Sequence, residues 1–125
     1  MLYRELTLEN PDGLNAALYD RFMAVSGTQR VRQTHHISGR FENTYIDRSD
    51  IPEVGTLLNT LRQQAAQLLG VPVESLKAGF WFNAMEAGHV TSLHHHDEND
   101  ELLSAVYYVR VPERSGDLVL HDGDE

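Results

Sequence analysis

The stretch "EAGHVTSLHHHDENDELLSAVYYVRVP", residues 86–112, joins three consecutive histidines, a run of acids and an apolar segment. On an extended chain, side chains two residues apart point to the same side. His94 and His96 can therefore converge on one ion, while His95 points elsewhere. The alternating apolar residues at 103–111 predict a β-strand. The stretch thus predicts a metal site directly before a strand, and the alternative is a solvated polar loop.

The donor atoms of this stretch indicate which metals fit. Imidazole and carboxylate without thiolate suit Fe(II), Mn or Zn in a catalytic site. Two histidines with one carboxylate and open positions form the facial triad of non-heme iron oxygenases. The spacing alone does not choose the carboxylate among Asp97, Glu98 and Glu101. A second register, with His95 and Asp97 as the ligand pair, stays open.

Composition limits the other functions that the chain can have. It has 125 residues, of which 41% are hydrophobic and 23% charged, as in an ordinary globular domain. It has no cysteine, which excludes disulfides, thiolate catalysis and sulfur-ligated metal. No apolar run is long enough to span a membrane, and the first residues lack the pattern of a secretory signal. We therefore expect one domain over residues 1–125, in the cytoplasm and without a membrane partner.

The net charge is −9, from 19 acids and 10 bases. A surface of this sign repels a phosphate backbone, and the sequence has no basic stripe with interleaved aromatics. We therefore expect no nucleic-acid partner. Acids gather beside the histidines at 97–101 and again at 122–124, where they can attract a cation. Solvated loops are the alternative meaning of such clusters.

A helix and a hairpin are predicted in the first part of the chain. Apolar residues at helical spacing predict a helix at 10–25, with Asn10 or Asp12 as its N-cap. Strand-like residues at 31–37 and 39–47, separated by a serine and a glycine, predict two linked strands. A short first strand is also predicted in "LYRELTL" near the N-terminus.

The strongest helical pattern covers residues 52–69. Asp50 followed by Glu53 fits a capping box at its start, and Gly70 fits a C-terminal stop. Its apolar residues keep a stripe along one face, so the helix must pack on another apolar layer. We expect that layer to be the back of a sheet.

The second half of the chain is predicted to be rich in strands, at 79–85, 103–111 and 117–121. Three neighbouring aromatic residues of the first of these strands are expected to pack in the core: Phe80, Trp81 and Phe82. Helices followed by short strands are typical of the α+β class. Short strands with glycine- and proline-bearing turns favour an antiparallel sandwich or a small barrel.

Several features of this half resemble the family of 2-oxoglutarate- and Fe(II)-dependent oxygenases. They are Trp81-x-Asn83, Gly88, His94-x-His96-Asp97, the strand that ends at Pro112, and "SGDL" at 115–118. The resemblance implies a double-stranded β-helix, the jelly-roll barrel that cupins share, with N-terminal helices packed on it. It also implies Fe(II) and 2-oxoglutarate as cofactors, a metal on His94, His96 and Asp97, and a hydroxylase-type reaction on a small molecule or a peptide.

Two further residues are predicted to bind the cofactor. Asn83 and Tyr107 each stand on a predicted strand near the metal-bearing segment, and cross-strand packing is the alternative role for both. In the resembling family a second histidine and an arginine usually come from late strands, and the 125 residues contain neither segment. We therefore expect residues 77–125 to form only the start of the barrel, after a helical and mixed part at 1–76. The apolar face left open would be covered by more of the same domain or by a second copy of the chain, and residues 1–125 alone would not turn over 2-oxoglutarate.

A second resemblance, to the first cupin motif, stays open. The motif asks for a glycine, a His-x-His pair and a glutamate at a set spacing, which Gly88, His94, His96 and Glu101 satisfy. This resemblance implies a cupin-like metal protein that does not use 2-oxoglutarate. A third alternative is a binding module built on an incomplete barrel, without catalytic activity.

Overall fold

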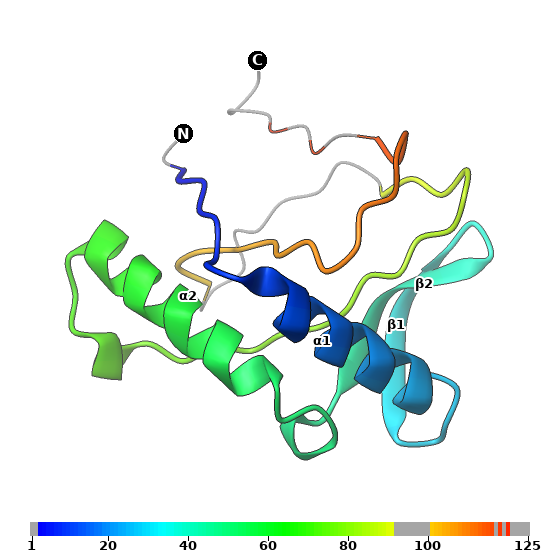
Figure 1. Ribbon diagram of the computed structural model, residues 1–125, viewed down its shortest axis with the longest axis horizontal. Helices are drawn as coiled ribbons and strands as arrows, with labels where there is room; N and C mark the ends of the chain where they lie inside the picture. Colours follow the sequence, from blue (N-terminus) through cyan, green and yellow to red (C-terminus); the bar gives the residue numbers. More distant parts are fainter. Residues whose placement is uncertain (1–2, 92–100, 117, 119, 121–125) are drawn as a thin grey trace.

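A computed structural model describes residues 3–91, 101–116, 118 and 120 of the chain (Figure 1). The regular elements in the described part are α1 (Pro11–Val25), β1 (Val31–Ile37), β2 (Arg40–Ile46), η1 (Arg48–Asp50), α2 (Val54–Leu69) and η2 (Val73–Ser75). This mixture of helices and one antiparallel hairpin confirms the α+β class, and the described residues include no jelly-roll sheet. Neither helix of this part of the chain is long and apolar enough to cross a membrane.

Helix α1 forms as its apolar spacing predicts. Leu18 is only 1% exposed, and Leu14, Phe22 and Val25 of the same stripe pack against the core around it. The proline at 11 stands in the first turn, where its missing N–H would have had no helical partner. The predicted side-chain cap is wrong for Asn10, which holds the N-cap position at φ 47° and makes no capping hydrogen bond.

Helix α2 begins at Val54, two residues later than predicted, because a short 3-10 turn precedes it. Asp47 caps that turn by accepting hydrogen bonds from the backbone N and the Oγ of Ser49, at 2.9 and 2.7 Å. The predicted capping box is wrong, since Asp50 and Glu53 each bind an arginine instead. The predicted stop is confirmed, because the residue after the helix, a glycine at φ 69°, adopts the left-handed conformation.

The core lies where α1, α2 and the end of β2 meet (Figure 1). Its buried residues come from these three elements and from the turn before α2: Leu18, Ile46, Ile51, Val54, Leu57 and Leu58. Truncating a side chain of this kind to alanine costs about 2–5 kcal/mol of stability. The predicted stripe of α2 is therefore confirmed, and the layer that it packs on consists of α1 together with the hairpin.

Strands β1 and β2 pair antiparallel in the predicted hairpin, with Val31 opposite Ile46 and Ile37 opposite Arg40. The two residues between them, a serine at φ 52° and a glycine at φ 81°, both have positive φ. Two-residue hairpin turns that match the strand twist require this conformation. One pair is missing from the ladder, because His35 has φ 60° and leaves the extended conformation. The hairpin thus places alternate residues of β2 on the core side, as the burial along the strand shows.

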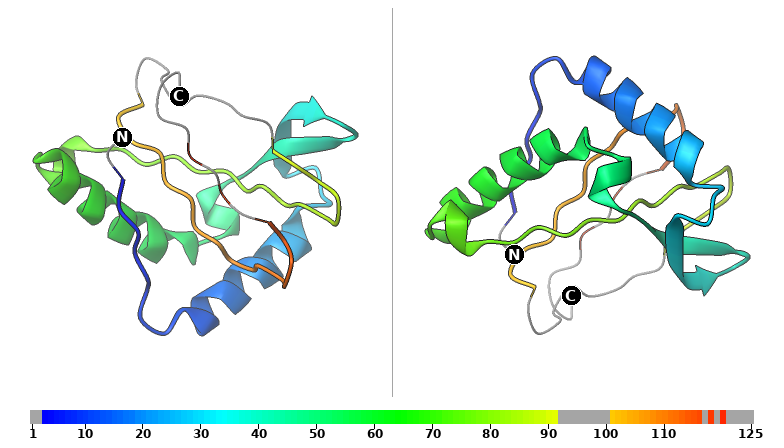
Figure 2. Two further views of the ribbon diagram at one scale, coloured as in Figure 1. Left: turned by 90° about the horizontal axis from the view of Figure 1, so that it is seen from above. Right: turned by 90° about the horizontal axis from the view of Figure 1, so that it is seen from below.

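The second half of the chain does not form the predicted strands. Residues 79–85 make a single antiparallel bridge, between Phe82 and Thr44, and residues 103–111 form no strand. The predicted first strand is also absent from the described residues 3–8, and most of 117–121 lies outside the described residues. Figure 2 shows the segments that follow α2 and precede the C-terminus crossing the molecule as extended chain. A strand needs a hydrogen-bonded neighbour along its length, and among the described residues these segments have no such ladder beyond the bridge between Thr44 and Phe82.

The extended segments nevertheless contribute to the core. Phe80, Phe82, Tyr107 and Val109 pack against the buried cluster. Of the apolar residues at 103–111, Tyr107 and Val109 thus face the core, whereas Leu103 and Val111 are exposed. The neighbouring Tyr108, on the even-numbered face, is 54% exposed.

Candidate metal centre and the residues around it

The predicted ligands His94, His96 and Asp97, like the alternatives His95 and Glu98, lie outside the described residues. Among the residues that the structure does describe, no three His, Cys, Asp or Glu side chains come close enough to hold a metal ion. The metal site therefore stays a prediction from the sequence. The structure describes the chain before this site, up to residue 91, and after it, from residue 101.

The chain that leads to the histidines is fastened to β2 at Phe82. Its backbone N donates to the Thr44 carbonyl at 2.8 Å, and the Thr44 N donates to the Phe82 carbonyl at 2.9 Å. Paired residues face the same side, so Phe82 faces the core while its neighbour Trp81 faces away and is 43% exposed. The Trp81 ring lies 6.1 Å from the ring of Tyr45 instead. The expected core packing of the three aromatics holds for Phe80 and Phe82 and is wrong for Trp81.

Asn83, predicted to bind the cofactor, lies in a polar cluster around Arg40, the first residue of β2. Its Oδ1 accepts a hydrogen bond from Arg40 Nη1 at 2.8 Å, and the same nitrogen reaches the Ala84 carbonyl at 3.3 Å. The Nη2 of Arg40 donates to the Oγ1 of Thr91 at 3.3 Å, and the Nδ2 of Asn83 donates to that oxygen at 3.2 Å. One guanidinium therefore joins both ends of the segment 83–91.

A tight turn closes this segment between its two ends. The Nδ1 of His89 accepts a hydrogen bond from the Glu86 N at 2.9 Å, and the His89 N donates to the Glu86 carbonyl at 3.1 Å. Gly88 has φ 84°, a conformation that favours glycine. Because Nδ1 accepts a bond, only the Nε2 of His89 remains for another partner.

Tyr107, the other predicted pocket residue, contacts a different part of the molecule. Its hydroxyl donates a short hydrogen bond to the Oδ1 of Asn15 on α1, and its ring packs against the core. Burial raises the pKa of Tyr107, and the hydrogen bond with Asn15 offsets part of that rise. Asn83 and Tyr107 therefore share no hydrogen-bond partner, since one is held by Arg40 and the other by α1.

Sequence reasoning missed two polar residues of β2, Arg40, which contacts Asn83, and Glu42, which is buried. Glu42 is 8% exposed on the core side of β2, and its Oε1 is buried without a hydrogen-bond partner. Glu42, Thr44 and Ile46 are alternate residues of β2, and all three are buried on the same face. The period-2 spacing of a strand could therefore have predicted that Glu42 is buried. No comparable signal marked Arg40, because its partners stand more than forty residues further along the chain.

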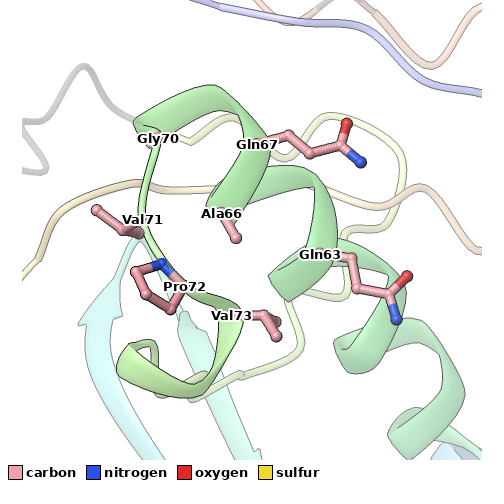
Figure 3. Close-up of a pocket in the computed structure, with 7 residues that line it drawn as sticks. All are labelled: Gln63, Ala66, Gln67, Gly70, Val71, Pro72 and Val73. Atoms are coloured by element: carbon pink, nitrogen blue, oxygen red, sulfur yellow. The ribbon is translucent and has the colours of Figure 1, made fainter.

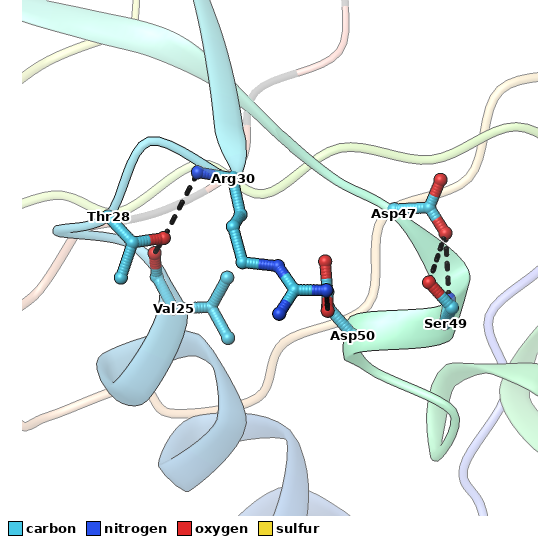
Figure 4. Close-up of polar contacts among 6 residues, drawn as sticks. All are labelled: Val25, Thr28, Arg30, Asp47, Ser49 and Asp50. Carbon is cyan, nitrogen blue, oxygen red and sulfur yellow. Dashed lines mark hydrogen bonds and ion pairs between the residues drawn. The ribbon is translucent and has the colours of Figure 1, made fainter.

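The other end of the hairpin carries polar contacts of a structural kind (Figure 4). Arg30 pairs with Asp50 at 2.5 Å, and its backbone N donates to Thr28 Oγ1 at 3.2 Å. The hydrogen bonds from the Ser49 side chain and backbone hold the pKa of Asp47 below its ordinary value. These contacts join the end of α1 to the start of α2, and each group involved already has a partner.

Two of the surface depressions among the described residues can be compared with the predicted site. The larger, of about 580 Å³, lies at the end of α2 and is lined by Gln63, Ala66, Gln67 and residues 70–73 (Figure 3). It has amide and apolar walls and no titratable side chain, so it offers no acid–base or metal chemistry. The smaller, of about 370 Å³, lies beside Arg32, whose guanidinium stacks 4.3 Å from the Tyr45 ring centroid. Neither depression includes Asn83 or Tyr107.

The donor chemistry of the segment 94–101 fits Fe(II). It offers three imidazoles and four carboxylates, and the chain has no thiol. Imidazole and carboxylate together are the donors of the facial triad, and excess carboxylates add negative charge around a divalent cation. The segment therefore contains every ligand type that such a site needs.

No curated protein and no solved structure matches the chain. One family, described as "Putative 2OG-Fe(II) oxygenase", matches residues 79–125. The matched region excludes both helices and the hairpin. It contains all five predicted site residues: Asn83, His94, His96, Asp97 and Tyr107. Over residues 79–125, the chain thus matches the 2-oxoglutarate- and Fe(II)-dependent oxygenase family, which confirms the resemblance found in its sequence.

Proposed function

We propose that this protein is a Fe(II)- and 2-oxoglutarate-dependent oxygenase of the hydroxylase type. The observation that carries the proposal is the family match over residues 79–125, which contains His94-x-His96-Asp97. The proposal includes a double-stranded β-helix for the part of the fold that starts at residue 77, and a cytoplasmic location. It also includes a small molecule or a peptide as the substrate.

In this proposal His94 and His96 hold the metal through neutral imidazoles, and Asp97 supplies the carboxylate. Glu98 and Glu101 are the alternative carboxylates. When bound, Fe(II) with 2-oxoglutarate would supply the oxygen activation that hydroxylates a carbon of the substrate. The protein would contribute the ligand geometry, the orientation of the co-substrate and the exclusion of water.

Asn83 and Tyr107 are the proposed pocket residues. Asn83 is exposed, and hydrogen bonds with Arg40 and Thr91 fix the orientation of its side-chain amide. Tyr107 is half-buried with its hydroxyl bonded to Asn15, so its contribution would come from the ring. A fixed side chain loses less conformational entropy on binding than a mobile one, which favours Asn83 as a contact.

Binding linkage between metal and co-substrate tests the proposal. Anaerobic calorimetry would titrate 2-oxoglutarate into the protein with and without Fe(II) or Mn(II). We expect 2-oxoglutarate to bind only with metal present, and metal to bind more tightly with 2-oxoglutarate present, since coupling between two ligands is reciprocal. Succinate is the matched control, because it lacks the 2-oxo group that chelates the metal alongside a carboxylate.

Each contrary result selects one of the alternatives. Metal binding that 2-oxoglutarate does not affect would favour a cupin-like metal protein with His94, His96 and Glu101 as ligands. Absence of any metal binding would favour a binding module. Equal effects of succinate and 2-oxoglutarate would show that the pocket recognises a dicarboxylate without chelation at a metal.

A further inference from the structure

Arg40 joins two parts of the chain that the family match separates. It begins β2, outside the matched residues 79–125, and its guanidinium donates to Asn83 Oδ1, the Ala84 carbonyl and Thr91 Oγ1 within them. The three distances are 2.8, 3.3 and 3.3 Å. The hairpin therefore holds both ends of the segment that precedes the histidines.

The chemistry of arginine suits this role. Its planar guanidinium carries five N–H donors in a fixed arrangement, so one side chain can hold several acceptors at set angles. Charge-assisted hydrogen bonds are roughly twice as strong as neutral ones. Among the described residues no carboxylate pairs with Arg40. Its guanidinium donates instead to the oxygens of Asn83, Ala84 and Thr91 and, at 3.4 Å, to the carbonyl of its neighbour Phe41.

Of these acceptors, Thr91 is the nearest in sequence to the predicted ligands. It stands three residues before His94, and three residues of extended chain span at most about 11 Å. Fixing the position of Thr91 therefore restricts the volume that the first histidine can occupy. Loss of a group that hydrogen-bonds directly to a metal ligand lowers metal affinity about 10–100-fold, so a contact one step further out should contribute at most the lower end of that range.

We infer that Arg40 is a positioning residue for the metal site: it clamps Thr91 against Asn83 and so fixes where the chain enters the ligand segment. The inference rests on the proposed function, since it needs a metal at His94 and His96. It assigns to the hairpin, which lies outside the family match, a direct part in the geometry of the site.

The variant Arg40→Met tests the inference, with Arg32→Met as the matched control. Arg32 lies on the other strand of the same hairpin and stacks on Tyr45, and it makes no hydrogen bond or ion pair with the described residues 83–91. Two quantities would be measured on the full chain: Mn(II) affinity by calorimetry, and hydrogen exchange at the Glu86 and His89 amides, both bonded in the turn. In Arg40→Met we expect Mn(II) binding that is weaker by up to about 10-fold and faster exchange at both amides. The control should change neither.

A second variant distinguishes loss of this contact from a general folding defect. Thr91→Val keeps the side-chain volume and removes the oxygen that accepts from Arg40 and Asn83, so it should reproduce both effects of Arg40→Met. The double variant should bind Mn(II) no more weakly than either single variant, because both remove the same contact. Near-ultraviolet circular dichroism would verify that each variant keeps the fold.

The outcomes separate this inference from the proposed function. Wild-type protein that takes up no Mn(II) overturns the proposed function, and the metal role of Arg40 with it. Wild-type protein that binds Mn(II), together with an Arg40→Met variant of unchanged affinity or unchanged exchange, overturns the role of Arg40 alone. Additive losses in the double variant also count against the clamp, because they would place Arg40 and Thr91 in separate contacts.

Discussion

Thr44 and Phe82 exchange two backbone hydrogen bonds, of 2.9 and 2.8 Å, although 38 positions separate them in the sequence. The pair joins β2 to the segment that runs toward the predicted metal ligands. On the core side, the ring of Phe82 lies 5.1 Å from that of Phe22 on α1. This one bridge therefore connects the family-matched part of the chain to the sheet and to the helical core.

Replacing Phe82 with alanine should lower the free energy of unfolding by about 3 kcal/mol, because the ring packs against the core. The neighbouring variant Trp81→Ala should cost less than about 1 kcal/mol, since Trp81 faces away from the core and is 43% exposed. Urea denaturation of both variants measures the difference. Equal losses would mean that residues 79–85 do not alternate between core and solvent as the bridge requires.

Two glycine-to-alanine substitutions should have opposite effects on stability. A Cβ at Gly39 or at Gly13 would meet no atom within 4 Å, so the two sites differ in backbone conformation. Gly39→Ala should cost about 1 kcal/mol or more, because φ is 81° in the hairpin turn. Gly13→Ala in α1 should instead stabilise by up to about 1 kcal/mol through helix propensity. Thermal denaturation decides, and a stabilising Gly39→Ala would rule out this turn.

Tyr107→Phe removes the hydrogen bond to Asn15 and should cost about 1 kcal/mol near neutral pH. Burial raises the folded-state pKa of Tyr107 above the ordinary 10.0, so folding favours the neutral phenol. Its contribution is present below pH 10.0 and is lost as the pH rises through the folded pKa. Tyr107→Phe should lose this alkaline dependence. Tyr108→Phe, at an exposed position, should keep it, and a stability curve that both variants share would contradict the burial of Tyr107.

The pair of Arg21 and Glu53, 2.6 Å apart, should make stability sensitive to acid. The hydrogen bond from Arg21 lowers the folded-state pKa of Glu53 below 4.5. Its contribution is therefore present above pH 4.5 and is lost as the pH falls through the folded pKa. Glu53→Gln and Arg21→Met should each flatten this part of the curve, measured by urea denaturation between pH 3 and 6. Unchanged acid sensitivity in both variants would show that the pair does not form in solution.

The helices and the hairpin could be predicted because local spacing determines them. Leu18 and Leu57 stand in stripes of helical period, and the Ser38–Gly39 pair suits a two-residue turn. The start of α2 could not be predicted, because Asp50 has a distant competing partner. Its carboxylate binds Arg30, Asp47 caps the 3-10 turn before the helix, and α2 itself begins without a side-chain cap. A capping pattern shows which bonds are available, and tertiary contacts decide which of them form.

The surroundings of the site were harder to predict for the same reason. Asn83 was identified from its position in a family-like segment, but its partner Arg40 lies on a strand 43 residues earlier. Tyr107 was identified as a pocket residue by its place on a predicted strand, yet its hydroxyl is bonded to Asn15. Such contacts form between segments that are distant in the sequence, so the local spacing of residue types does not predict them.

The central claim is that His94 and His96 bind a divalent metal, and metal-dependent thermal stabilisation tests it most directly. A ligand that binds only the folded state stabilises it by about 2.7 kcal/mol at a hundred times its dissociation constant. Saturating Mn(II) should therefore raise the melting temperature of the wild type by several degrees, and less below about pH 6, where imidazoles are protonated.

The double variant His94→Ala/His96→Ala should lose this stabilisation completely. The control His35→Ala/His36→Ala, which removes two neighbouring histidines from β1, should keep it. The measurement is the melting temperature of the three proteins with and without Mn(II) at pH 7.5. The account predicts a shift for the wild type and the control only, and an undiminished shift in His94→Ala/His96→Ala would contradict it.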